Sequence, residues 1–254
     1  MRCAARLAGP RSPVFERAHH QRIGRILASL DAARLRSLGC WFGGGTAIAL
    51  RRGEYRESLD IDFMVSDLGG YGELRQRLMG AADLRAITRD GCDAFALERA
   101  MRADQYGIRG FVLADEVAIK FEVVSQGRMG LQTPGRADVV CGVATLSLLD
   151  LAASKLLANA DRWRDDSVFS RDAIDLAMLD LPPRQLRPAL HKVTAAYGIG
   201  VADDMQQALQ ALRGRSGWLL RCMHSLAITL PPALVQQKLR RLARRMAVVT
   251  EPSA

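Results

Sequence analysis

Trp-Phe-Gly-Gly-Gly-Thr-Ala-Ile-Ala-Leu-Arg-Arg-Gly-Glu-Tyr-Arg-Glu-Ser-Leu-Asp-Ile-Asp-Phe, residues 41–63, joins a glycine turn to a pair of closely spaced carboxylates. The glycines open a short helix, which we expect over residues 46–52. The stretch then ends on Asp60 and Asp62, in a strand-like run that continues to Val65. Because alternate side chains of a strand point to the same face, the two carboxylates share one side of this strand.

Two carboxylates held this close repel each other, and each raises the pKa of the other unless a cation lies between them. Mg²⁺ suits such a pair, because it is commonly bound by one or two carboxylates together with substrate phosphates. The glycine turn adds backbone N–H groups at a helix start, where an anion binds favourably. Either feature alone is common in ordinary turns. Their combination, followed by an apolar strand, predicts phosphoryl or nucleotidyl transfer.

Length and composition favour a globular intracellular protein. The 254 residues allow one large domain or two modest ones, and 49% of them are hydrophobic. We find no run of about 20 apolar residues that would span a membrane, and the basic N-terminus lacks the apolar segment of a signal peptide. Five cysteines without a Cys-x-x-Cys pair indicate reduced thiols. We therefore expect a cytoplasmic location, with a frayed tail at residues 1–10.

The formal net charge of +9 predicts attraction to polyanions. Nearly all of the cationic side chains are arginines, which bind phosphate through two parallel hydrogen bonds. A nucleic-acid partner is one interpretation. The other is a compositional preference for arginine and alanine that raises the charge without any partner.

Hydrophobic periodicity predicts a long amphipathic helix over residues 13–37 and a short strand over 40–42. Between the carboxylate strand and residue 125 it predicts one helix and several strands, namely a helix at 71–80 and strands at 84–88, 95–98, 106–113 and 117–124. Glycines, Pro134 and polar residues indicate a connector at 126–144. Beyond it the pattern is helical, with helices expected at 145–161, 183–196, 203–213, 216–224 and 232–248. We place a domain boundary near residue 140, which separates residues 1–140 from residues 141–254.

In the strand at 117–124, Lys120 and Glu122 point to the same face. They can form an ion pair on a half-exposed strand, or Glu122 can be a third carboxylate of the site.

The segments Gly44-Gly45-Thr46-Ala47-Ile48-Ala49-Leu50-Arg51 and Arg56-Glu57-Ser58-Leu59-Asp60-Ile61-Asp62-Phe63 resemble the first motif of the AbiEii/AbiGii nucleotidyltransferase toxins. A later series is similar to the further motifs of that family: Asp-Leu-x-x-x-Lys-Leu-Leu-Ala from Asp150, then Asp161-Arg162, then Arg-Asp-x-x-Asp-Leu from Arg171. The resemblance covers residues 38–180. It implies an α/β (α+β) fold, with a polymerase-β-like core built on a small mixed sheet and a helical C-terminal domain that completes the active site.

The resemblance also implies a reaction, the transfer of a nucleoside monophosphate from an NTP to a hydroxyl group. Two Mg²⁺ ions would be held by three carboxylates, Asp60, Asp62 and Glu122. At the third position the family more often has an aspartate, and Glu122 would bind the first metal or accept the proton.

The remaining roles follow from the same resemblance. The triphosphate would lie on the helix start, at Gly44, Gly45 and Thr46. Lys155 would neutralise the β- and γ-phosphates, and Asp172 would be the downstream catalytic acid. Three residues are secondary: Asp175 either supports the site or only caps its helix or pairs with Arg171, while Arg51 and Ser58 either bind nucleotide or support the fold.

Family members are toxins of toxin–antitoxin systems, and characterised relatives modify tRNA 3′ ends. The resemblance thus implies tRNA as acceptor and a cognate antitoxin encoded nearby. A small-molecule or protein acceptor and a degenerate nucleic-acid-binding module stay open, although clustered carboxylates argue against a pure binding module. The preferred NTP and the oligomeric state also stay open. So does the role of the basic C-terminal helix, which either is a solvated face or contacts RNA through Lys238, Arg240, Arg241, Arg244 and Arg245.

Overall fold

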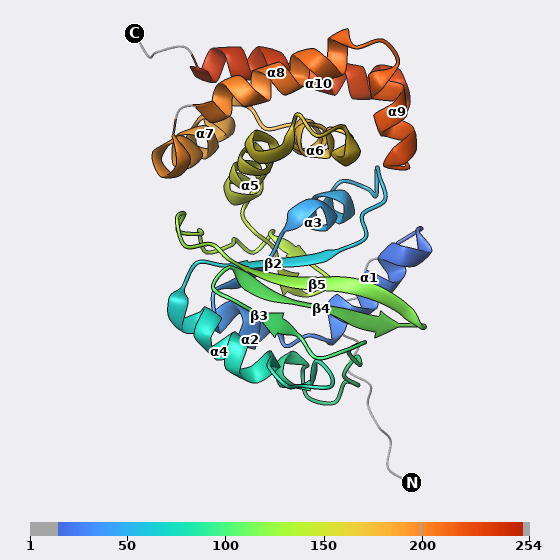
Figure 1. Ribbon diagram of the computed structural model, residues 1–254, viewed down its shortest axis with the longest axis vertical. Coiled ribbons are helices and arrows are strands. Elements are labelled where there is room, and N and C mark those ends of the chain that lie inside the picture. Colours follow the sequence, from blue (N-terminus) through green and yellow to red (C-terminus); the bar gives the residue numbers. More distant parts are fainter. Residues whose placement is uncertain (1–14, 199, 251–254) are drawn as a thin grey trace.

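A computed structural model describes residues 15–198 and 200–250, and it combines a mixed β-sheet with a group of helices (Figure 1). The expected N-terminal tail and the first residues of the predicted helix at 13–37 lie outside the described residues. The predicted α/β class, a small mixed sheet followed by helices, is confirmed. Among the helices that the structure describes, none has the length and apolar character needed to cross a bilayer.

The helix predicted at 13–37 is wrong in one respect, because the described part is two helices, α1 (Ala18–Ser29) and α2 (Ala32–Ser37). Leu30 is extended between them, with φ −73° and ψ 150°. The side chain of Asp31 then accepts a hydrogen bond from the backbone N–H of Arg34 at 2.9 Å. An aspartate that caps a new helix start competes with continuation of the preceding helix, so the chain breaks there.

The main sheet has five strands in the order β1-β2-β5-β4-β3. Strands β2 and β5 run parallel, whereas the other neighbours are antiparallel. The parallel register places Asp62 opposite Glu122. The strands are β1 (Cys40–Phe42), β2 (Ile61–Val65), β3 (Arg102–Ala103), β4 (Gly107–Ala114) and β5 (Val117–Ser125).

Two predicted strands are wrong. Residues 84–88 contain a 3₁₀ helix, η1 (Arg85–Ile87), which buries Leu84 and Ile87 three positions apart. Residues 95–98 form only isolated bridges to neighbouring segments. The preceding helix, α4 (Leu68–Leu78), starts before the predicted residue 71, because Asp67 caps it. In these short segments the apolar spacing does not distinguish a strand from a tight helical turn.

The predicted connector at 126–144 includes a small hairpin of β6 (Val139–Val140) and β7 (Val143–Ala144). Its turn residues, Cys141 and Gly142, both have positive φ, at 50° and 85°. The hairpin leads into the helical half.

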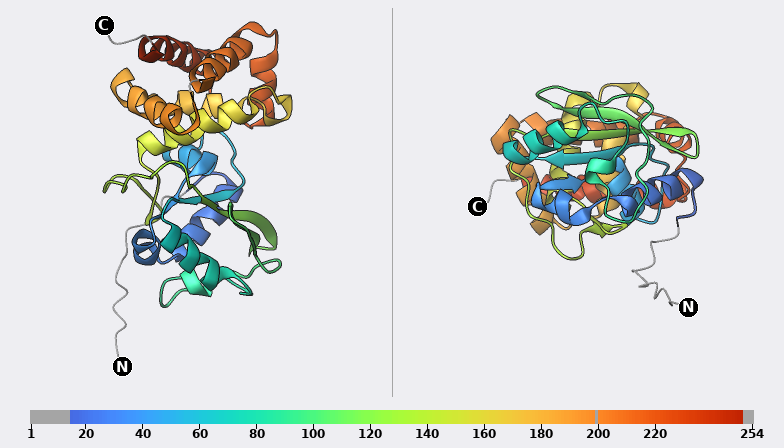
Figure 2. Two further views of the ribbon diagram at one scale, coloured as in Figure 1. Left: turned by 60° about the vertical axis from the view of Figure 1, so that its left-hand side comes forward. Right: turned by 90° about the horizontal axis from the view of Figure 1, so that it is seen from below.

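The helical half lies on one side of the sheet in Figure 1 and in the left-hand view of Figure 2. Helix α5 contacts α6, α7 and α8, and α10 packs across α6, α7 and α8. The helices are α5 (Leu148–Arg162), α6 (Arg171–Leu179), α7 (Pro183–Tyr197), α8 (Gly200–Gly214), α9 (Trp218–Ser225) and α10 (Pro232–Thr250), with the 3₁₀ turn η2 (Asp166–Val168) before α6.

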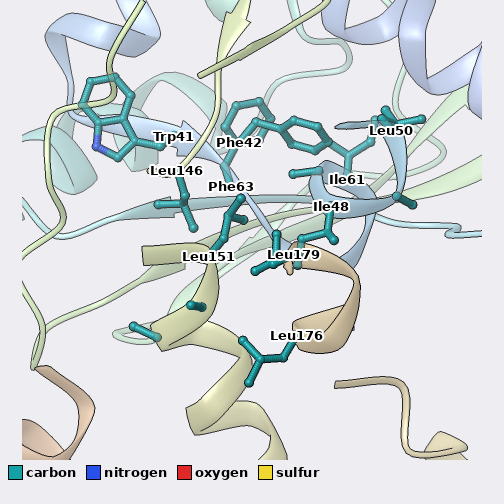
Figure 3. Packing of buried hydrophobic residues seen from close by; sticks show 14 of the residues in the cluster. Trp41, Phe42, Ile48, Leu50, Ile61, Phe63, Leu146, Leu151, Leu176 and Leu179 are labelled. Atoms are coloured by element: carbon teal, nitrogen blue, oxygen red, sulfur yellow. The ribbon is translucent and has the colours of Figure 1, made fainter. Parts of the chain in front are cut away.

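Helix α3 (Gly44–Arg51) joins the two halves, because it contacts β2 as well as α5 and α6. Figure 3 shows Leu179 of α6 between Phe63 of the sheet and Ile48 of α3, with Leu176 of α6 pointing toward α5. Phe63 is buried and packs against the rings of neighbouring strands. One continuous apolar cluster thus extends from the sheet into the helices, and the domain boundary near residue 140 stays a prediction.

Candidate active site

A cleft of about 500 Å³ lies between the sheet and the helical half. One wall comes from the start of α3 and from β2 and β5, and the other comes from α5, α6 and the end of α9. Most of the residues predicted for the site line this cleft, namely Gly44, Gly45, Ser58, Asp60, Asp62, Glu122 and Lys155. The other three, Thr46, Arg51 and Asp172, are not among the described residues that line it.

The Asp60 and Asp62 carboxylates face the cleft from the start of β2. The alternation of β2 explains this, because Ile61, Phe63 and Val65 are buried on its opposite face. Burial, and then the neighbouring charge of Asp60, raise the pKa of Asp62 to about 6. The positive charges of two cleft lysines oppose this rise without cancelling it. Asp62 therefore holds its negative charge at a cost.

This pair fits a divalent cation, because a cation would neutralise the repulsion that raises the pKa of Asp62. Within residues 15–198 and 200–250, no group of three or more His, Cys, Asp or Glu side chains is arranged to hold a metal ion. The remaining ligands would come from water and from substrate phosphates, as is usual for Mg²⁺.

Glu122 lies beside Asp62 in the parallel register, and both of its carboxylate oxygens are engaged. Arg109 Nε donates to Oε1 and Lys120 Nζ donates to Oε2, each at 2.6 Å. Burial alone would raise the pKa of Glu122, but the two cations outweigh it and hold the pKa below its usual value. The expected ion pair between Lys120 and Glu122 is present, and Glu122 also lines the cleft. A role of Glu122 as metal ligand stays a prediction.

The glycines at the start of α3 are required by close approach. Gly44 has φ +68°, and a Cβ there would lie 2.3 Å from Asp62 Oδ2. A Cβ on Gly45 would lie 2.1 Å from Arg56 Nη2. The helix start thus lies directly against the carboxylates, and a backbone cradle for phosphate at this point stays a prediction.

Thr46 is buried and supports the carboxylate segment from behind. Its hydroxyl hydrogen-bonds with Ser58 Oγ at 2.8 Å and with the backbone carbonyl of Asp60. These contacts hold the chain just before Asp62 in place. Thr46 contributes to the site here by positioning.

His20 is a supporting residue that the sequence analysis missed. Its Nε2 accepts the backbone N–H of Ser58 at 3.1 Å, so its Nδ1 carries the proton and donates to Glu54 at 2.7 Å. Burial lowers the pKa of His20, although Glu54 acts in the opposite direction. The lowered pKa favours the neutral ring. No local pattern reveals this contact, because the hydrogen-bonded residues are 38 positions apart.

Lys155 is nearly buried and lies between two aspartates of α6. Its Nζ is 2.9 Å from Asp172 Oδ1 and 2.8 Å from Asp175 Oδ2. Arg56 donates twice to Asp175, at 2.7 and 2.9 Å. Arg162 donates twice to Asp172, at 2.7 and 3.0 Å. We call these five side chains the buried ion network.

Charge pairing overcomes burial throughout the buried ion network. Burial would raise the pKa of Asp172 and of Asp175, but the adjacent cations hold both pKa values below the usual range. Burial would lower the pKa of Lys155, and the two aspartates raise it instead. All three groups are therefore charged at neutral pH. Asp175, which the sequence left as secondary, also accepts the hydroxyl of Tyr55 and has the most partners.

Arg51 is not brought to the cleft. Its guanidinium group binds Asp138 at 2.9 Å and Thr145 Oγ1 at 2.8 Å, so it links α3 to the segment around the small hairpin. These contacts match the fold-supporting alternative for Arg51.

A family model described as the nucleotidyl transferase AbiEii toxin of type IV toxin–antitoxin systems matches residues 25–243. The chain belongs to the AbiEii family. This AbiEii-family chain is therefore a nucleotidyltransferase, and the family is one of toxins. No curated protein matches it significantly.

Structurally similar solved proteins include JHP933 from Helicobacter pylori, which is 15% identical in sequence. The match covers 91% of the AbiEii-family chain and 90% of the JHP933 chain, with a TM-score of 0.49. A putative nucleotidyltransferase from H. pylori is 14% identical, and the match covers 93% of the AbiEii-family chain and 96% of the H. pylori chain, with a TM-score of 0.46. MenT4, a nucleotidyltransferase toxin from Mycobacterium tuberculosis H37Rv, is 18% identical, and the match covers 94% of the AbiEii-family chain and 87% of the MenT4 chain, with a TM-score of 0.49.

Replacement of Asp62 by Asn should stabilise the metal-free protein. The raised pKa means that folded Asp62 keeps a proton that the unfolded chain releases between about pH 4 and pH 6, so its contribution to stability falls as the pH rises through that window. Asp62→Asn should therefore add about 1–3 kcal/mol to the free energy of unfolding at about pH 8 and less at about pH 5. Urea unfolding with a chelator measures this. A lower stability of the variant at the higher pH would contradict the assigned charge repulsion.

Replacement of Asp175 by Asn should be strongly destabilising, because it leaves the buried cations of Arg56 and Lys155 short of negative charge. We expect a loss of about 3–5 kcal/mol in the free energy of unfolding. Glu73→Gln is the matched control, since Glu73 pairs with Arg77 at 2.9 Å on the exposed surface and should cost less than about 1 kcal/mol. Equal stability of the two variants would show that the buried ion network does not hold the fold together.

Proposed function

We propose that this nucleotidyltransferase moves a nucleoside monophosphate from an NTP to the 3′-terminal hydroxyl of tRNA, with Mg²⁺, as the toxin of a pair with a cognate antitoxin. One observation carries the proposal. The cleft sets Asp60, Asp62 and the start of α3 on one wall and Lys155 on the other. An activated phosphate needs negative ligands for its metal and positive groups for its leaving pyrophosphate, and this cleft offers both.

Each part of the cleft has a proposed task. Asp60 and Asp62 would hold Mg²⁺, which when bound polarises the α-phosphate and lowers the pKa of the attacking hydroxyl. Backbone N–H groups at the start of α3 bind triphosphate oxygens. Lys155 offsets charge on the β- and γ-phosphates. Glu122 lines the cleft beside Asp62, so it is our candidate to bind the first metal or to accept the hydroxyl proton.

The proposed RNA acceptor is supported by charge. The chain carries a net charge of +9, and Arg162 and Arg171 line the helical wall of the cleft. Asp172 binds Arg162, whereas Arg171 has no acidic partner among the described residues. Its guanidinium group is therefore available for a phosphate of the acceptor. Both proposed substrates, NTPs and tRNA, occur in the cytoplasm, which is the location that the sequence predicts.

The test is label transfer. Wild-type protein incubated with each α-labelled NTP, Mg²⁺ and bulk tRNA should label RNA of tRNA size. Asp60→Ala should slow this transfer roughly a thousandfold, because it removes charge stabilisation from the reacting phosphate. Asp93→Ala is the control, since Asp93 is an exposed acid outside the cleft lining, and it should keep the wild-type rate.

Two results would oppose the proposal. Undiminished label transfer by Asp60→Ala would remove the carboxylate pair from the reaction. Label found on protein or on a small molecule, with none on RNA, would replace tRNA as the acceptor.

A further inference from the structure

The C-terminal helix α10 has two basic faces with different surroundings. On one face Lys238, Arg241 and Arg245 all point to Asp180 at the end of α6, at 3.3, 2.9 and 2.5 Å. These cations share one carboxylate and are half-buried. They attach α10 to the helical half, so this face has a structural explanation.

The other face carries Arg240 and Arg244, which are exposed and one helical turn apart. Together with Arg213 of α8 they line a groove of about 430 Å³ between α8 and α10. Among the described residues, none of these three arginines has an acidic partner. The protein therefore places three guanidinium groups around one hollow without neutralising them.

This groove continues toward the catalytic cleft. A neighbouring hollow of about 360 Å³ shares Arg213 and Arg240 with it and includes Arg215 and Leu220. Leu220 belongs to α9, and the far end of α9, at Ser225, lines the catalytic cleft. Helix α9 has 8 residues, so it is about 12 Å long. Figure 1 shows α9 running from the layer of α8 and α10 toward α3.

We infer that the groove lined by Arg213, Arg240 and Arg244 binds the phosphate backbone of the RNA acceptor, one helix away from the reacting end. Arginine matches phosphate with two parallel hydrogen bonds. The groove has little else to offer, since its other lining residues are Ala233 and Gln237. A protein partner would need buried apolar or aromatic anchors, which this lining lacks. The inference rests on the proposed function in taking RNA as the acceptor.

The test measures binding rather than catalysis. Fluorescence anisotropy with labelled bulk tRNA, without NTP, gives the affinity of the full-length protein between about 50 and 200 mM salt. We expect about tenfold weaker binding at the lowest salt concentration for the triple variant Arg213→Gln, Arg240→Gln, Arg244→Gln. Its plot of log affinity against log salt should be shallower by about 2 to 3, which corresponds to three lost phosphate contacts.

The control removes the same charge elsewhere, by Arg75→Gln, Arg85→Gln, Arg102→Gln, three exposed arginines on the sheet side of the molecule. It should keep the wild-type slope. Because all six arginines are exposed, both variants should unfold at the wild-type temperature.

The outcomes separate this inference from the proposed function. Equal slopes for the groove variant and the control would overturn the inference, and a protein partner would then be the occupant to seek. If that occurred while wild-type protein still labelled tRNA, the proposed function would stand. A shallower slope for the groove variant would support the RNA groove, even if wild-type protein put its label on another acceptor.

Discussion

The ammonium group of Lys155, enclosed between the carboxylates of Asp172 and Asp175, is the interaction on which the site depends. Removing three charges from water is costly, and only close pairing with further hydrogen bonds offsets that cost. Arg56 supplies such bonds to Asp175, and Arg162 supplies them to Asp172. Breaking any one of these pairs would leave a buried charge without an opposite charge to compensate it.

The same network connects distant parts of the chain. Arg56 belongs to the segment between α3 and β2, whereas the lysine and the aspartates belong to α5 and α6. The absence of a side chain at Gly45 lets α3 approach this ion pair. The glycine turn, the carboxylate strand and the helical half are therefore held in one arrangement. The cleft is the space left between them, with charge pairing on its helical wall and charge repulsion at Asp62 on its sheet wall. Functional sites commonly contain destabilising charges, here that of Asp62, which the stability of the surrounding structure offsets.

Local chemistry predicted the parts of the site that depend on near neighbours. The alternation around Asp60 and Asp62 placed both on one face, and the alternation of β5 placed Lys120 beside Glu122; both placements are confirmed. The sequence could not predict contacts set by packing between remote segments. The hydrogen bond from Ser58 to His20 and the link from Arg51 to Asp138 depend on how whole elements dock. The helix break at Asp31 cannot be predicted from the apolar spacing, which continues across it, because the break depends on one capping side chain.

The most direct measurement is an experimental structure of the protein with a non-hydrolysable NTP and Mg²⁺. We expect the triphosphate to lie between the start of α3 and Lys155, with Asp60 and Asp62 at the metal and with Lys155 Nζ within hydrogen-bond reach of a phosphate oxygen. A nucleotide bound outside the cleft, or a triphosphate in the cleft with Lys155 contacting only its two aspartates, would contradict it.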